Sequence, residues 1–212
     1  MQCTVTVRVL GEMQSNCYIL RGEQNPNACV LIDIGDGAST ILSYLEKNDL
    51  TPKAVLLTHG HYDHIAGVAE VIAKYPAPVY IHTADFSMLQ DSRTNLADYL
   101  TQKPFHPIQD ALTMEDGDVL TFDDITLRVL HTPGHTKGSV CFLGEDVLFT
   151  GDTLFRLSRG RTDFPGGSDQ EMLASFRKLA ALEGDYTVYP GHGNASTLFY
   201  EKMHNPTFTY QS

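Results

Sequence analysis

The segment from Thr58 to His64 concentrates side chains that bind metal ions. It reads Thr-His-Gly-His-Tyr-Asp-His, so three imidazoles and one carboxylate fall within six residues. Neutral imidazole and carboxylate groups suit zinc, iron and manganese. His59 and His61 alternate as on an extended segment, whereas Asp63 and His64 are adjacent and diverge at the start of a helix. We therefore expect this turn to supply ligands to two neighbouring ions; the alternative interpretation is a polar helix cap rich in histidine.

Three further turns carry a histidine or an aspartate directly after a strand-like apolar run. They contain His135 in Pro-Gly-His, Asp152 in Thr-Gly-Asp and His192 in Gly-His-Gly. The histidine-rich segment itself follows the apolar run 54–57 in the same way. Functional groups of α/β proteins gather beyond the C-terminal ends of strands, and glycine permits the tight turns needed there. Four strand ends that each deliver such a side chain predict a single site.

Together these motifs resemble the metallo-β-lactamase superfamily over nearly the whole chain. The resemblance implies an α+β fold, the four-layer αββα sandwich, and two divalent metal ions, with zinc as the first expectation and iron or manganese as alternatives. It implies that Asp152 bridges the two ions and that Asp63 and Asp152 are the catalytic carboxylates. The remaining ligands that it implies are His59, His61 and His135 for one ion, and Asp63, His64 and His192 for the other.

Within that superfamily, the segment Gly151–Phe155 resembles the glyoxalase II branch. The stretch Gly160–Gly167 and the residues after His192 are similar to the short, single-domain bacterial proteins of this type. Full-length glyoxalase II adds a C-terminal helical domain that grips glutathione, but only about twenty residues follow His192 here. We therefore expect one domain over residues 1–212 without that helical domain. The resemblance does not identify the thiol that the substrate carries.

The expected reaction is hydrolysis of a thioester such as a hydroxyacylglutathione. Two cations lower the pKa of a shared water, so a bridging hydroxide forms at neutral pH, and Asp63 can orient it. A thiolate with a pKa near 8.5 leaves without a strong general acid. A β-lactam nitrogen needs more help, and the Thr-Gly-Asp carboxylate belongs to the hydrolase branch. Both points argue against a class B β-lactamase.

Other activities of the superfamily compete with this one. Its persulfide (sulfur) dioxygenases share a Gly-Arg-Thr-Asp-Phe stretch but hold a single iron on residues matching His59, His135 and Asp152. The continuation Pro165–Gly167 favours the hydrolase branch. Another metallo-hydrolase or a lactonase is a further alternative. A metal-binding protein without turnover is disfavoured, because no ligand position is vacant.

Three residues near these motifs have two interpretations each. Arg161 either binds a substrate carboxylate or forms a structural ion pair with Asp163. Tyr62 either contacts substrate or packs beneath the ligands. Asp33 either supports a ligand histidine or belongs to an unrelated turn. Arg156 and Arg159 are interpreted as solvated or loop-binding, with substrate contact as the alternative. Lys137 and Ser139 are expected at the start of a strand. The histidines without a matching motif are interpreted as ordinary structure: His82, His106, His131 and His204.

The composition of the chain limits the classes of binding partner that we expect. A net charge of −11 over 212 residues argues against a general nucleic-acid surface, and no apolar stretch approaches membrane-spanning length. No secretory signal is visible, so we expect a cytoplasmic protein that acts on a small molecule as a monomer or homodimer. The four cysteines, Cys3, Cys17, Cys29 and Cys141, lack metal or redox spacing, and we interpret them as buried free thiols; a disulfide is the alternative.

Periodicity predicts mixed α and β structure in two similar halves. The stretch 84–112 is polar and irregular, helical in parts. We expect helices near 38–48, 63–74 and 168–182 with a short final helix, and strands near 3–10, 16–21, 28–34, 54–57, 79–82, 118–122, 125–131, 138–143, 146–149 and 187–189.

Overall fold

The first half of the chain forms a six-stranded sheet with helices on one face. The computed structural model describes residues 3–209. The strands of this sheet are β1 (Thr4–Leu10), β2 (Ser15–Arg21), β3 (Ala28–Ile32), β4 (Thr51–Leu56), β5 (Val79–His82) and β6 (Leu112–Met114). The first three pair antiparallel, and β3 to β6 pair parallel in sequence order. The helices are α1 (Ala38–Lys47), α2 (Tyr62–Ile65), α3 (Val68–Lys74), the 3-10 helix η1 (Thr83–Leu89) and α4 (Ala97–Leu100).

The second half repeats this arrangement. Its sheet has the order β14-β13-β10-β9-β8-β7, in which only the β10–β13 pair is parallel among the described residues. These strands are β7 (Val119–Phe122), β8 (Ile125–His131), β9 (Val140–Leu143), β10 (Val147–Gly151), β13 (Thr187–Pro190) and β14 (Ser196–Thr197). A small ribbon of β11 (Leu154–Phe155) and β12 (Ser158–Arg159) follows β10, and the helices are α5 (Asp169–Ala180), α6 (Leu198–His204) and α7 (Pro206–Thr209).

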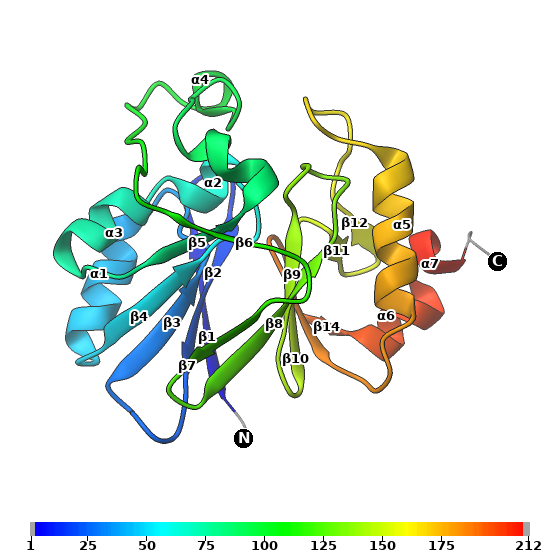
Figure 1. Ribbon diagram of the computed structural model, residues 1–212, viewed down its shortest axis with the longest axis horizontal. Coiled ribbons are helices and arrows are strands. Elements are labelled where there is room, and N and C mark those ends of the chain that lie inside the picture. The colour runs from blue at the N-terminus through cyan, green and yellow to red at the C-terminus, as the bar shows by residue number, and fades with distance from the viewer. Residues whose placement is uncertain (1–2, 210–212) are drawn as a thin grey trace.

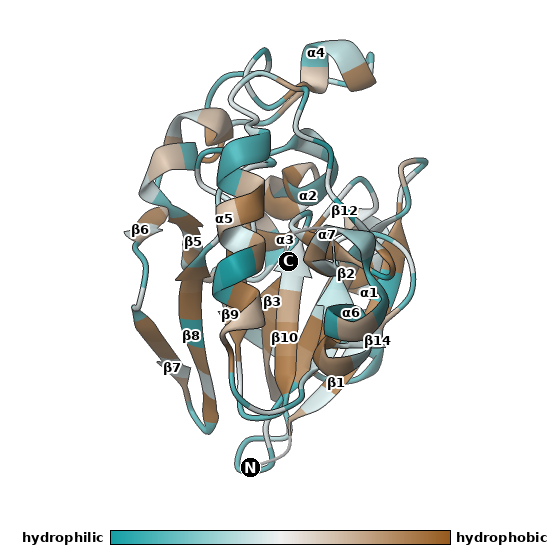
Figure 2. Cartoon of the chain, turned by 90° about the vertical axis from the view of Figure 1, so that its right-hand side faces the viewer, coloured by the Kyte–Doolittle hydropathy of each residue, from teal (hydrophilic) through white to brown (hydrophobic). Residues whose placement is uncertain are grey.

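The two sheets pack face to face between two helical layers (Figure 1). Helices α1 and α3 cover the outer face of the first sheet, and α5, α6 and α7 cover that of the second. The predicted αββα sandwich is confirmed. Three apolar clusters fill the spaces between the four layers, and the apolar strands of the sheets lie inside the more polar helix surfaces (Figure 2). Burial of these clusters is the main force that holds the strand ends in fixed positions.

The helix predicted near 63–74 is wrong in one respect, because it divides into α2 and α3. The division occurs at Gly67, whose backbone N–H donates to the carbonyl of Ile34 at 2.9 Å. A Cβ atom at this position would meet the Gly35 carbonyl oxygen and the Ile34 side chain. The chain therefore turns here so that the turn after β3 can pack directly against the metal-binding segment.

The remaining differences concern short elements. Strands β6, β11, β12 and β14 are too short to produce a periodic signal, so they were not predicted, whereas η1 and α4 lie in or beside the stretch 84–112 that was expected to be helical in parts. All four cysteines are free thiols, as predicted; Cys3 is only partly buried, and the other three are buried. No helix among the described residues is long and apolar enough to cross a membrane.

Candidate metal centre

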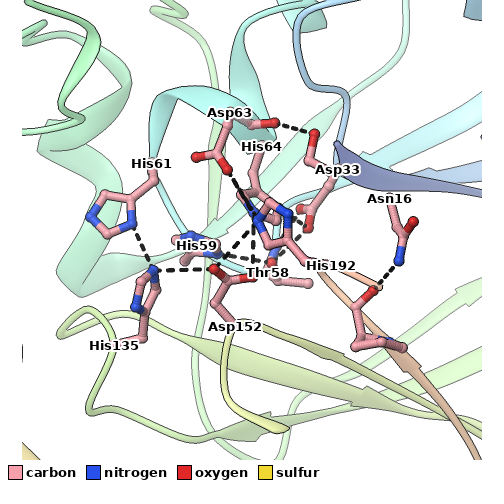
Figure 3. A network of polar contacts seen from close by, with 12 residues as sticks. Asn16, Asp33, Thr58, His59, His61, Asp63, His64, His135, Asp152 and His192 are labelled. Atoms are coloured by element: carbon pink, nitrogen blue, oxygen red, sulfur yellow. Dashed lines mark hydrogen bonds and ion pairs between the residues drawn. The ribbon is translucent and has the colours of Figure 1, made fainter. Parts of the chain in front are cut away.

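The turns that follow five strands meet at one end of the sandwich. Strands β3 and β4 of the first sheet and β8, β10 and β13 of the second all end at this place, next to α2 (Figures 1 and 3). Two backbone hydrogen bonds join the sheets here: Val140 N–H donates to the Thr58 carbonyl at 2.8 Å, and Asn16 N–H donates to the Gly191 carbonyl at 2.7 Å. These hydrogen bonds fix the positions of the strand ends of one sheet relative to those of the other.

All seven predicted ligands converge in this place (Figure 3). Their nitrogen and oxygen atoms form three overlapping groups, each within 4.8 Å: His59, His61 and His135; His59, His64 and Asp152; and Asp63, His64 and His192. Asp152 lies between the first and the last group, with carboxylate oxygens 3.4 Å from His64 Nε2, 3.5 Å from His135 Nε2 and 3.6 Å from His192 Nε2. Its two oxygen atoms therefore face ligands of both groups, and the bridging role stays a prediction.

The donor atoms fit two metal ions. Nε2 of His59, Nε2 of His61 and Oδ1 of Asp152 are buried without a hydrogen-bond partner in the described structure. Buried polar atoms without partners are costly unless something binds them. His61 Nδ1 also faces His135 Nε2 at 2.8 Å. Two such nitrogen lone pairs repel each other unless a proton or a cation lies between them, so the first group suits one cation and the Asp63 group a second.

The pKa shifts of the histidines differ between the two ligand groups. Burial, together with the neighbouring imidazole of His135, lowers the pKa of His61 to about 3, so this ring is neutral and able to bind a cation. Burial also lowers the pKa of His59. For His64 burial acts in the same direction, but the carboxylates of Asp63 and Asp152 raise its pKa well above the ordinary value. A cation in the second group would therefore displace a proton from His64.

The ligand rings are oriented by partners behind them. Nδ1 of His64 donates to Asp33 Oδ2 at 2.8 Å, so its Nε2 atom faces the carboxylates of the site. The Thr58 hydroxyl donates to the same Asp33 oxygen at 2.7 Å and lies 3.1 Å from Nδ1 of His59. Nδ1 of His135 donates to the backbone carbonyl of Arg161 at 2.7 Å. Each contact leaves the other ring nitrogen free to bind metal.

Glycine is required where the last ligand turn passes closest to the centre. A Cβ atom at Gly191 would collide with the Asp152 carboxylate and with the ring of His64. The backbone of this turn lies against the ligands themselves, because Gly191 N–H donates to the Gly151 carbonyl at 2.8 Å. A larger residue than glycine would not fit at position 191, next to His192.

Comparison with known proteins agrees with this geometry. Residues 10–192 match the family described as the metallo-β-lactamase superfamily. The chain belongs to this superfamily. It is 32% identical to the hydroxyacylglutathione hydrolase GloC of Haemophilus influenzae over 203 residues, which cover 94% of this chain and 95% of that one. Metal-dependent hydrolysis is the general chemistry that this membership supports.

Two solved structures of the superfamily resemble the chain closely. One is described as the B3 metallo-β-lactamase BLEG-1; it is 37% identical with a TM-score of 0.90, over 97% of this chain and all of that one. The other is TTHA1623 in a di-iron-bound form, 34% identical with a TM-score of 0.83, over 95% of this chain and 99% of that one. Imidazole and carboxylate ligands of this kind accept zinc, iron or manganese.

The structure also places the residues that had two interpretations. Asp33 lies behind His64, as the supporting interpretation expects. Tyr62 is buried and lines a neighbouring cavity rather than the pocket at the ligands, so its packing beneath the ligands stays a prediction. Arg161 forms two hydrogen bonds with Asp163, at 2.6 and 2.7 Å, which corresponds to the structural ion pair.

The residues interpreted as ordinary structure lie elsewhere or at the edge. His82 and His131 stack at 4.0 Å between ring centroids, outside the ligand groups. Arg156 is exposed. Arg159 lines the pocket at the metal centre and pairs with Asp169 at 3.0 Å, which both the loop-binding interpretation and the substrate-contact alternative allow.

The sequence analysis missed Asp85, which joins the two loops of the three-histidine group. Its buried carboxylate accepts hydrogen bonds from Gly60 N–H at 3.0 Å, from the Thr136 hydroxyl at 2.6 Å and from Gly138 N–H at 2.7 Å. Gly60 lies between His59 and His61, and Thr136 follows His135. One signal was available: Asp85 comes shortly after the strand-like run 79–82, as the other site residues follow theirs.

Replacing Asp85 with asparagine should weaken the three-histidine group selectively. The carboxylate of Asp85 now accepts hydrogen bonds from N–H groups, and the amide nitrogen of asparagine would face these donors without being able to accept from them. The loop at Gly60 and the loop at Thr136 should therefore separate slightly. We expect metal affinity to fall about 10- to 100-fold, as for other groups that support ligands. Titration with zinc against a chromophoric chelator measures this affinity.

Glu201→Gln is the matched control for that experiment. Glu201 is likewise buried and accepts hydrogen bonds from Leu157 N–H, Ser196 and Asn205, away from the ligands. Both variants should lose folding stability, but only Asp85→Asn should lose metal affinity. Equal affinities in the two variants would show that Asp85 merely stabilises the fold.

Proposed function

We propose that the protein hydrolyses thioesters of small acids, such as hydroxyacyl thioesters, at a centre of two divalent metal ions. The observation that carries this proposal is the placement of Asp152 between two ligand groups, beside a pocket of about 480 Å³ that the ligands line. Pockets of this size accept small-molecule substrates. Similarity to a relative described as a hydroxyacylglutathione hydrolase supports the same substrate class.

The ligand residues and Asp63 would have different roles in hydrolysis. Bound divalent ions would lower the pKa of a water that they share and polarise the substrate carbonyl. Asp63 Oδ2 lies 3.1 Å from His192 Nε2, and its side chain is partly exposed, so it can orient a water and accept its proton. The thiolate that leaves needs no strong general acid. This explains how the site can work without a protonated donor at the leaving group.

The proposal is tested by a substrate panel on metal-loaded protein. The panel contains S-lactoylglutathione, a neutral acyl thioester, a chromogenic β-lactam and a persulfide whose oxidation is followed by oxygen uptake. We expect thioester hydrolysis to exceed the other activities in kcat/KM. Oxygen uptake with the persulfide and no thioester hydrolysis would support the dioxygenase alternative instead.

Hydrolysis of β-lactams is a second candidate. Similarity to a structure described as a B3 metallo-β-lactamase, over nearly the full length of both chains, supports it despite the sequence-based argument against this class. A β-lactam amide and a thioester both react through attack on a carbonyl, so one site can act on both. The β-lactam arm of the panel decides between them.

Replacing Arg161 with alanine distinguishes its two interpretations. Its guanidinium is paired with Asp163 on an exposed surface, where such pairs contribute little to stability. We expect a change of at most about 3 °C in Tm and similar changes in KM for all thioesters. Arg93→Ala is the control, because Arg93 forms the same paired contact with Asp91 outside the pocket lining. A several-fold rise in KM confined to carboxylate-bearing thioesters would assign Arg161 to substrate binding.

A further inference from the structure

The pocket beside the ligands has an apolar wall. Five side chains from four segments of the chain form it, namely Met13, Leu96, Leu100, Phe155 and Phe164. The ring of Phe164 lies 5.8 Å from that of His61, and the ring of Phe155 lies 6.0 Å from that of His192, between centroids. The wall therefore flanks both ligand groups, and a substrate whose carbonyl reaches the ligands must contact it.

The charges of the pocket arginines are already balanced. Arg161 pairs with Asp163, and its guanidinium lies over the ring of Phe164 at 4.0 Å. Arg159 pairs with Asp169 at 3.0 Å; its Nη1 atom is buried without a partner and offers a hydrogen bond, but the charge is offset. Lysine is absent from the described lining. Beyond the metal ligands, the described lining thus offers no unpaired positive side chain that would select a carboxylate-bearing thiol such as glutathione.

Leu96, which lines the pocket, has a backbone conformation that is rare for its residue type. Its φ of 70° and ψ of 7° lie in the left-handed region, which is rare for a bulky residue. Such conformations persist where the surroundings enforce them, often at binding sites. Here Asn95 holds the turn: its side-chain amide donates to the Met88 carbonyl at 2.8 Å, and its backbone carbonyl accepts from the N–H of Tyr62, the residue after His61.

Helix α4 extends this wall over the centre. It lies beyond α2 at the same end of the molecule in both views (Figures 1 and 2). Leu100, its last residue, is 40% exposed although it lines the pocket. An exposed leucine beside an apolar wall gains by contact with an apolar ligand, because that contact removes both surfaces from water.

From these observations we infer that the natural substrates are uncharged thioesters with an apolar acyl chain. This inference rests on the proposed function and specifies the substrate class. The acyl chain packs against the wall formed by the five apolar side chains, and the carbonyl faces the metal ligands. Burial of each methylene should raise kcat/KM about two- to fourfold until the wall is filled.

The inference is tested with thioesters that differ in one half at a time. Acetyl, butanoyl and hexanoyl thioesters of N-acetylcysteamine and of glutathione are compared on the zinc-loaded protein. We expect kcat/KM to rise about two- to fourfold for each methylene on both thiols. For a given acyl chain, we expect the neutral N-acetylcysteamine thioester to be preferred.

A pair of variants identifies the wall as the cause. Leu100→Ser should reduce the ratio of hexanoyl to acetyl kcat/KM at least about threefold, with metal content unchanged. Leu112→Ser is the control, because Leu112 is similarly exposed, at 48%, but lies on β6 outside the pocket lining; its ratio should equal that of the unaltered protein.

The outcomes separate this inference from the proposed function. Hydrolysis that is independent of chain length, or that prefers the glutathione thioester of each acid, would overturn the inference and leave the thioester hydrolase standing. The same holds if Leu100→Ser and Leu112→Ser have equal ratios. Hydrolysis of none of the thioesters would overturn the proposed function and this inference with it.

Discussion

Replacing Asp152 with alanine should reduce kcat/KM for thioester hydrolysis at least about a hundredfold. Its carboxylate lies between the three-histidine group and the Asp63 group, with His64, His135 and His192 all within 3.6 Å. Although burial opposes its ionisation, the His64 imidazole holds the pKa of Asp152 well below the ordinary value, so the group is a carboxylate at neutral pH. The variant loses that charge where two cations would need it. Steady-state kinetics on protein with measured metal content provide the test.

His82→Ala is the control for that variant. His82 is buried and stacks on His131, but it belongs to none of the ligand groups. Its replacement should lower Tm and leave kcat/KM of the folded protein nearly unchanged. Equal activity in Asp152→Ala and His82→Ala would mean that the centre is assigned wrongly.

Removal of metal should abolish activity and lower Tm by at least about 10 °C. An ion held at about a thousand times its Kd stabilises the folded state by about 4 kcal/mol. In a chain of this size, 1 kcal/mol corresponds to about 2–4 °C. Without cations, the facing nitrogens of His61 and His135 and the orphaned atoms of His59 and Asp152 lose their partners. Thermal unfolding before and after dialysis against a chelator measures the change.

Restoration provides the control for metal removal. Returning zinc or manganese to the dialysed protein should recover both Tm and hydrolysis, since the fold around the site is built on apolar cores that need no metal. A Tm that does not respond to chelation, in protein shown to have lost its metal, would contradict the role assigned to the buried donors.

The ligands were predictable because their signal is local. The spacing from His59 to His64 and the short turns at His135, Asp152 and His192 are visible in the sequence. The strand ends bring these segments together, as the sequence pattern predicts. The αββα sandwich was also predictable from the sequence, but only through the resemblance of these motifs to a known family.

The rest of the site depends on contacts between distant segments. Asp85 holds Gly60 and Thr136, which lie 25 and 51 residues away along the chain, so no window of sequence reveals its role. The left-handed conformation of Leu96 is set by Asn95 and its partners rather than by the intrinsic preference of leucine. The division of α2 from α3 at Gly67 likewise follows from close packing against Ile34.

Metal stoichiometry followed together with activity tests the central claim most directly. Metal-free protein is titrated with zinc or manganese while bound metal and thioester hydrolysis are measured at each step. We predict two equivalents per chain, with hydrolysis that appears as the second ion binds and proceeds without oxygen. One equivalent of iron, with no further ion bound on addition of zinc or manganese, would contradict the binuclear hydrolase.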